Sequence, residues 1–324
     1  MDRTRRHLIL AAGAGALSSG FPALAQAYPA RPVKLVSPYG PGGSNDFSAR
    51  LLAQSLSQKY GQQFVVENKP GAGNRVANEQ VARATPDGYT LLWAAAPFAI
   101  NSASGVPERY DIHKDFVRIG PHVVGPIFLI VNAQSPVRSV ADFVRTAREK
   151  PGGATFASPG AGSGPHLTGE LFGVEAKFKP TTVHFRGDST AYTELLAGRV
   201  EATLTAITTA LPYVKAGKLR VLAVASEQRS TVFPDAPTFG EQGYPGVVGY
   251  GWFGLLAPAG VPAAYAKQLN RDANAALSDP QIANKLVDFG LQPQPESSEA
   301  FSAFIDREVR KWTALVRKTG IVLE

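Results

Sequence analysis

The sequence predicts an α/β fold of two lobes with a ligand cleft between them, and three observations support this prediction. Short apolar runs alternate with longer amphipathic stretches, as in βαβ units whose helices cover a mostly parallel sheet. This alternation occurs in two successive blocks of about 100 residues, followed by a helical tail. Two extended apolar segments, 123–131 and 250–257, stand where the chain would cross between the blocks. Two crossings would form a hinge, and small ligands commonly bind between domains.

The first block is expected to contain strands at 33–37, 64–67 and 89–93 and helices at 46–60 and 78–83. The longer helix places Phe47, Leu51 and Leu56 on one face, and Gly61 follows at a position typical of a helix end. The sequence Pro86-Asp87-Gly88 is typical of a turn and precedes the third strand. The block therefore has a βαβαβ order, which favours parallel strand pairing.

The second block repeats this order, and the tail is helical. We expect strands at 127–131, 155–157, 183–185, 202–205 and 219–225, with helices at 141–150, 166–172, 189–197 and 208–216. The tail should form helices at 262–277, 280–289 and 299–318, the last with an apolar stripe along one side. Lobe 1 is predicted to comprise residues 28–125 plus 252–324, and lobe 2 residues 126–251.

Residues 1–27 have the three parts of a secretory signal peptide and are excluded from the fold. Arginines at 3, 5 and 6 precede a short apolar run at 8–17, and Ala25-Gln26-Ala27 forms a small-residue cleavage pattern before Tyr28. The run has about half of the roughly 20 residues that span a bilayer, so an uncleaved anchor is the weaker alternative. Residues 4–9 also resemble a twin-arginine signal, which leaves the export route open.

The composition excludes several classes of function. The chain has no cysteine, so it has no disulfide, thiol nucleophile or cysteine-bound metal. Its net charge is +7, but the lysines and arginines are scattered, which does not favour a nucleic-acid partner. A mild positive field would favour encounter with small anions, although solubility alone explains the charge equally well. We expect a monomer without metal or cofactor.

Two glycine-rich loops are the main candidates for ligand binding. The first runs through Tyr39, Gly42 and Gly43 to Ser44, Asn45 and Asp46, and the second covers 158–166; each joins a predicted strand to a predicted helix. Glycine allows close approach of the backbone, Ser44 or Asn45 can cap the helix, and helix N–H groups favour an anion. One such loop is more often a simple connection. Two in equivalent positions favour a shared ligand.

Three further positions have two open interpretations each. His166 can donate to an anion or only cap and pack, and Arg186 can bind a carboxylate or pair with Asp188. The hydroxyl-rich segment 206–209 can hydrogen-bond a ligand or cap a helix. Neither the Gly-Lys-Ser/Thr of a nucleotide-binding P-loop nor the Gly-x-Ser-x-Gly of a hydrolase occurs. Residues 249–254 match Gly-x-Gly-x-x-Gly, but no strand-to-helix turn is expected there and the aromatic residues would crowd a pyrophosphate, so we interpret the match as chance.

The ordered motifs resemble the tripartite tricarboxylate transporter substrate-binding family, the Bug receptors. The similarity covers nearly all of the chain after residue 27. It is carried by segments 28–32, 38–43, 67–73, 86–91, 158–167, 217–220, 234–238 and 256–260.

The resemblance implies a periplasmic Venus-flytrap protein of the type II binding-protein fold. It implies a ligand carboxylate held largely by backbone N–H groups and ordered waters, and delivery to an integral membrane permease. The implied site comprises Tyr39, Gly42, Gly43, Ser44, Asn45, Asp46, Ala96, Ser158, Gly160, Gly162, Ser163, His166, Arg186, Gly187, Ala206 and Thr208.

Two departures from the family pattern concern the ligand class. Phe185 stands where the family often has Tyr, and the segment 205–208 lacks the family's frequent Asp. The missing acid disfavours an amino-acid ligand and leaves apolar or hydroxylated acids open. Two other functions remain as alternatives: presentation of a bound ligand to a membrane sensor, and an exported hydrolase that uses Ser163 and His166.

Overall fold

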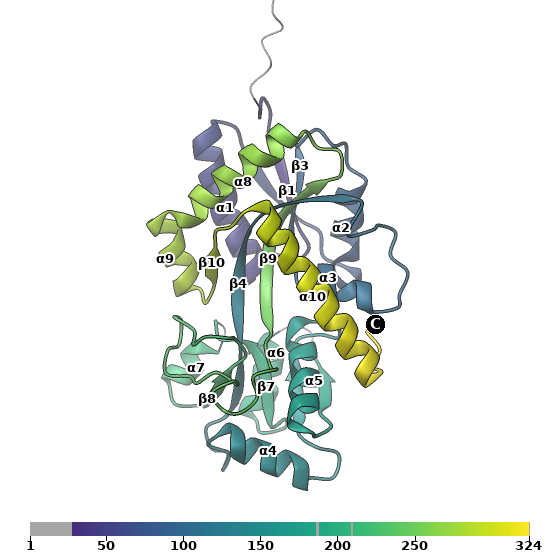
Figure 1. Cartoon of the computed structure of the whole chain (residues 1–324). Helices are drawn as coiled ribbons and strands as arrows, with labels where there is room; N and C mark the ends of the chain where they lie inside the picture. Colours follow the sequence, from purple (N-terminus) through teal and green to yellow (C-terminus); the bar gives the residue numbers. More distant parts are fainter. Residues whose placement is uncertain (1–27, 186–187, 209, 324) are drawn as a thin grey trace, which may run out of the picture.

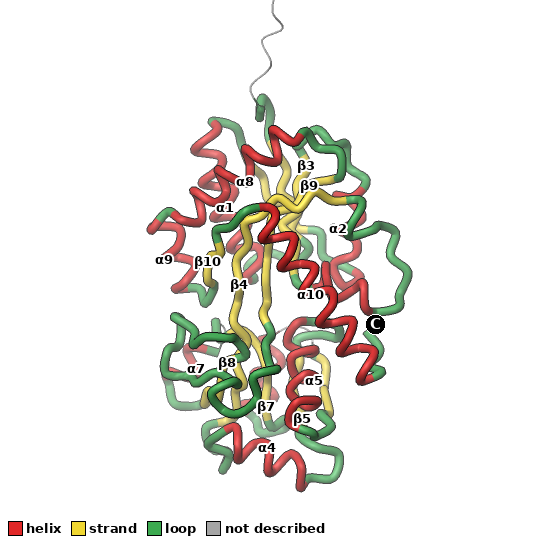
Figure 2. Tube along the Cα trace, viewed as in Figure 1, coloured by secondary structure: helices red, strands yellow, loops and turns green. Residues whose placement is uncertain are grey.

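The computed structural model describes residues 28–185, 188–208 and 210–323. Two groups of elements lie one above the other and are joined by the long strands β4 (Phe116–Asn132) and β9 (Tyr250–Pro258) (Figures 1 and 2). These strands include the two apolar crossings expected from the sequence. The signal-peptide prediction for 1–27 lies outside the described residues. In the part that the structure covers, no helix combines the length and apolarity needed to cross a bilayer.

The upper sheet is mixed and not mostly parallel, which corrects the prediction. It contains β1 (Val33–Ser37), β2 (Phe64–Asn68), β3 (Thr90–Ala95), β9, β4 and the short β10 (Gln292–Gln294). Strand β1 pairs in parallel with β2 and β3, whereas β9 lies antiparallel between β3 and β4. Strand β9 begins more than 150 residues after the end of β3, so no local sequence pattern reveals that it lies beside β3 in the sheet.

Helices cover this sheet on both faces (Figure 1). They are α1 (Ser44–Tyr60), α2 (Arg75–Ala82), α3 (Pro97–Ile100), α8 (Ala263–Ser278), α9 (Pro280–Asp288) and α10 (Ser298–Thr319), with 3₁₀ turns at Ala72–Asn74 and Asn101–Ala103. The predicted helices α1, α8, α9 and α10 are confirmed to within two residues at each end. Strand β10, helix α3 and the first half of β4 were not predicted.

The lower group forms around the second half of β4. Its strands are β5 (Thr155–Ser158), β6 (Thr181–His184), β7 (Ala202–Ala206) and β8 (Leu219–Val224), and its helices are α4 (Val140–Glu149), α5 (Gly164–Ala176), α6 (Asp188–Leu196) and α7 (Leu211–Lys215). Strands β7 and β8 flank β4 in antiparallel pairing, and β5 and β6 continue beyond β7 in parallel. Helix α7 is shorter than the predicted 208–216.

The register of β4 shows that β1 and β5 end on opposite sides of one gap. Strand β4 runs in the same direction as β1, while β5 runs against it. The end of β1 at Ser37 is level with the irregularity at 119–121 of β4, and the end of β5 at Ser158 is level with Leu129. About seven residues of β4, or roughly 25 Å, separate the two levels. Both glycine-rich loops therefore leave their strands toward this gap.

Candidate ligand-binding site

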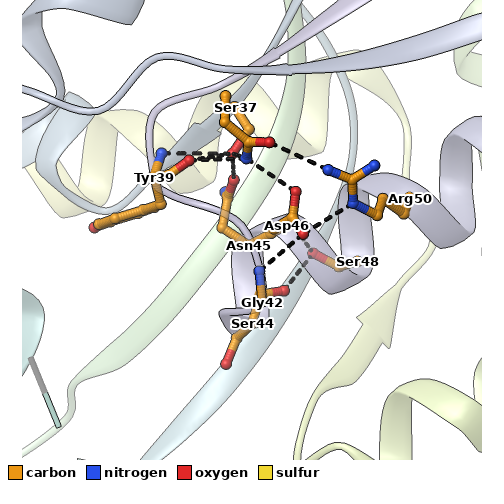
Figure 3. Close-up of polar contacts among 9 residues, drawn as sticks. Ser37, Tyr39, Gly42, Ser44, Asn45, Asp46, Ser48 and Arg50 are labelled. Carbon is orange, nitrogen blue, oxygen red and sulfur yellow. Dashed lines mark hydrogen bonds and ion pairs between the residues drawn. The ribbon is translucent and has the colours of Figure 1, made fainter.

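The first loop is shaped by the buried carboxylate of Asp46 (Figure 3). Its oxygens accept hydrogen bonds from the Gly42 amide at 3.0 Å, from Arg50 Nε at 2.9 Å and from Asn68 Nδ2 at 2.9 Å. Burial alone would raise the pKa of Asp46, but the bonds from Arg50, Gly42 and Asn68 together lower it. Asp46 is therefore ionised and directed into the loop that contains it.

The start of α1 has no side-chain cap, which corrects the expectation that Ser44 or Asn45 caps it. The N-cap residue is Gly43, in an extended conformation and without a capping side chain. Asn45 is buried, accepts a bond from Ser37 Oγ at 2.6 Å and donates to the Trp93 carbonyl at 3.2 Å. The side chains at the helix start thus hold the loop, and the backbone N–H groups of the first turn are left for another acceptor.

The second loop contains its own cap. Ser163 is the N-cap residue of α5; its hydroxyl accepts from the His166 amide at 3.3 Å and donates to the Gly160 carbonyl at 2.7 Å. The hydroxyl of Ser158 donates to the same carbonyl at 2.9 Å. The Gly162 amide, at a left-handed φ of 67°, donates to Nδ1 of His166 at 3.1 Å.

His166 orders this loop with a neutral ring. Burial, and secondly the nearby His184, lower the pKa of His166 to about 4. The two imidazole rings meet edge to face at 4.6 Å, and Nε2 lies 3.7 Å from Glu170, whose pKa is raised mainly by burial. Near neutral pH the ring carries no positive charge, so the geometry favours capping and packing over ion pairing with an anion.

The remaining predicted residues divide into four groups. Ala96 follows β3, and Ala206 ends β7 with its carbonyl accepting from Tyr192. Thr208 donates to the Phe289 carbonyl at 2.7 Å, while the Phe289 ring stacks on Phe47 at 4.0 Å. Arg186 and Gly187 lie outside the described residues. Tyr39 is 37% exposed at the loop.

Phe289 thus links the segment after β7 to the start of α1. Thr208 belongs to the predicted second lobe, and Phe47 directly follows Asp46 in the first. The structure thereby brings Thr208 close to the first loop across the gap. The Thr208 hydroxyl donates its proton to the Phe289 carbonyl. The sequence did not indicate this contact, because the two residues are 81 positions apart.

A cavity of about 760 Å³ also lies between the two groups, away from the glycine-rich loops. Its walls come mainly from β4, β10 with the residues after it, α10 and the segment 226–231, together with Val248, Tyr250 and Val287, and no sequence pattern connects these stretches. Within it, Nδ1 of His122 lies 2.6 Å from Oε1 of Glu296. None of the predicted site residues lines this cavity.

The geometry around Ser163 does not support the hydrolase alternative. The Ser163 hydroxyl donates to a backbone carbonyl, and Nδ1 of His166 accepts from a backbone amide, so the two side chains do not form a nucleophile–base pair. Among the described residues, no group of three or more His, Asp or Glu side chains is placed to hold a metal ion.

Known proteins that resemble this chain in sequence and structure identify its family. Residues 48–321 match the model of the tripartite tricarboxylate transporter family receptors. Protein BugT of Bordetella pertussis is 32% identical, with 100% of each chain covered. Among solved structures, an R. palustris protein with adipate has 32% identity and a TM-score of 0.82, covering 91% of this chain and 99% of its own. MatC from Rhodopseudomonas palustris with bound malate has 30% identity and a TM-score of 0.77, covering 89% and 100%.

The match to BugT extends over both groups of elements and both loops, whereas the family model begins just after the first loop. A structure described as a periplasmic transporter is also similar, with 34% identity and a TM-score of 0.82, covering 92% of this chain and 100% of its own. The shared architecture is the mixed α/β periplasmic binding protein fold. The chain therefore belongs to the tripartite tricarboxylate transporter receptors, a family of periplasmic solute-binding proteins that are not enzymes.

Proposed function

We propose that the chain captures one small organic acid in the gap between its two glycine-rich loops. The observation that carries this proposal is the uncapped start of α1, which stands beside the gap toward which the second loop also extends. Helix N–H groups bind anions, and a charge at a helix N-terminus is stabilised by roughly 0.3–2 kcal/mol. Relatives with adipate and with malate favour a carboxylate as the anion.

The proposed contacts are the backbone groups of Gly43, Ser44 and Asn45 from the first loop and the loop 160–164 from the second. Tyr39 is exposed at the mouth of the first loop and is proposed to cover the ligand. The carboxylate of Asp46 would repel a ligand carboxylate, but its oxygens are already engaged by three donors. Arg186, Gly187, Ala96 and Ala206 remain proposed contacts on the basis of sequence.

We further propose the cellular setting of this function. The signal peptide would be removed between Ala27 and Tyr28, leaving a monomer in the periplasm with lobes 28–125 plus 252–324 and 126–251. The ligand-bound form would deliver its acid to an integral membrane permease. A membrane sensor that recognises the same form is the second candidate, and the transporter family favours the permease.

Small dicarboxylates should raise the melting temperature, and their diamides should not. At a hundredfold excess over the dissociation constant, a ligand stabilises by about 2.7 kcal/mol, which corresponds to roughly 4–5 °C for a protein of this size. The assay is thermal unfolding of the mature protein with adipate, malate and a series of other acids, each beside its amide. Native mass spectrometry of the purified protein would identify a retained acid.

The amide is the matched control, because it keeps the size of the acid while removing the charge and replacing one acceptor oxygen by an NH2 donor. Equal shifts from acid and amide would contradict carboxylate recognition. No shift from any acid in the series, together with no retained acid in the mass spectrum, would contradict the proposed function.

A further inference from the structure

The two glycine-rich loops have the same internal construction. Each begins with a serine at the end of its strand, followed by proline: Ser37-Pro38 and Ser158-Pro159. The serine hydroxyl contacts both the amide and the carbonyl of the residue two positions later, Tyr39 in one loop and Gly160 in the other. The first loop is one residue longer.

The similarity between the two loops continues into the first turn of the helix that follows each of them. Gly42 and Gly162 both adopt left-handed φ angles, of 88° and 67°. Each donates its amide to the side chain four residues later: Gly42 to Oδ2 of Asp46 at 3.0 Å, and Gly162 to Nδ1 of His166 at 3.1 Å. Both acceptors are buried at the third position of a helix. Asp46 and His166 therefore have the same task in the two loops, although their chemistry differs.

We propose that His166 is the positioning residue of the second loop and makes ligand capture sensitive to acid. This inference rests on the proposed function of the loops. A ring with an unprotonated Nδ1 accepts the Gly162 N–H, whereas a doubly protonated ring presents a second donor to it. Protonation therefore breaks the bond that fixes the left-handed turn at Gly162, and the loop loses the shape in which its amides converge on the ligand.

The groups around the ring determine the pH range. Its described neighbours are His184 from β6 and Glu170 from α5, and Lys179 acts on Glu170. Burial lowers the pKa values of both histidines, that of His166 to about 4 from an ordinary value of 6.5. Because the folded-state pKa is the lower one, the stability due to the neutral ring is complete above pH 6.5. It is lost as the pH falls toward 4.

The test compares wild type with His166→Asn and His166→Leu. Asparagine places an oxygen acceptor at the same position along the side chain and does not titrate, so it imitates the first loop. At pH 7 we expect His166→Asn to bind the acid found by thermal shift within about threefold of wild type. His166→Leu should bind the acid about tenfold more weakly than wild type, which is the equivalent of one net hydrogen bond.

The pH profile separates positioning from packing. The ligand's own carboxyl also titrates in acid, so the informative quantity is the ratio of wild-type to His166→Asn affinity between pH 7 and 3.5. Because the pKa of the His166 ring is about 4, we expect this ratio to fall about fourfold by pH 3.5. A constant ratio, or His166→Leu binding as tightly as wild type at pH 7, would overturn the proposal.

A measurement without ligand keeps this inference distinct from the proposed function. Long-range ¹H–¹⁵N spectra should show His166 as the tautomer protonated at Nε2, and the Gly162 amide signal should shift as that ring titrates. Observation of the Nδ1–H tautomer would overturn the inference even if the protein binds acids. The expected tautomer in a protein that binds no acid would contradict only the proposed function.

Discussion

Replacing Asp46 by Ala is expected to lower the free energy of unfolding by roughly 3 kcal/mol and to weaken ligand binding by more than tenfold. The substitution removes the common acceptor of Gly42, Arg50 and Asn68. Arg50 is half exposed and can turn to water, but the Gly42 amide and the Asn68 amide lose a buried acceptor. A hydrogen bond to a charged group contributes about 1.5–3 kcal/mol, so the loss of two such bonds accounts for the expected destabilisation, and the loop then no longer presents the start of α1 in one shape.

Two matched variants isolate the cause. Arg50→Ala removes only the exposed ion-pair partner and should cost less than about 1 kcal/mol. Asp46→Asn keeps one acceptor oxygen, so its loss of unfolding free energy should lie between those of Arg50→Ala and Asp46→Ala. The measurements are urea unfolding and ligand titration at pH 7. If Asp46→Ala were as mild as Arg50→Ala, the carboxylate would not be the organising group of the loop.

The pH dependence of the same variants gives an independent check. The hydrogen bonds to Asp46 hold its pKa below the ordinary 3.8, despite the opposing effect of burial. Its contribution to stability is therefore present above pH 3.8 and is lost as the pH falls through the lower folded-state value. Unfolding measured from pH 5 to 3 should show a shallower acid loss in Asp46→Asn than in wild type.

Local patterns in the sequence were sufficient for most elements. Apolar periodicity and the flanking glycines Gly61 and Gly320 located α1 and α10, whose caps adopt left-handed conformations at those positions. The two loops were found because glycine, serine and proline cluster between a strand and a helix. Such signals are contained within ten or twenty residues, which is the range over which periodicity and capping act.

Long-range pairing was the part that sequence reasoning could not supply. Strand β9 lies between β3 and β4, and β10 adds to the edge of β4, through contacts that no local pattern encodes. The first half of β4 was missed because Gly120-Pro121 interrupts its apolar pattern at the irregularity of the strand. Within the site, residue type alone did not distinguish a side chain facing the ligand gap from one facing its own loop. Asn45 and Asp46 are therefore in the predicted loop but have structural partners.

The second large effect is expected at Gly254, in the strand that crosses between the two groups of elements. A Cβ at this position would lie 2.2 Å from Cζ and 2.7 Å from Cε2 of Phe301 in α10. Phe301 is fully buried, stacks on His122 and meets Trp252 edge to face, so its ring has no open space to enter. Gly254→Ala should therefore destabilise the protein by about 3 kcal/mol, the upper end for overpacking, and lower its melting temperature by roughly 5 °C.

A second glycine of β9 provides the control variant, and a smaller side chain at Phe301 should relieve the clash. Gly251→Ala adds the same methyl group where the nearest heavy atom is 3.7 Å away, and it should change the melting temperature little. Phe301→Leu removes the clashing ring atoms at a cost of about 1.5 kcal/mol from lost packing. The double variant Gly254→Ala/Phe301→Leu should then be more stable than the sum of the single costs, by at least about 1 kcal/mol. Additive costs would mean that β9 and α10 separate to accept the methyl group, and that the crossing is not held by this contact.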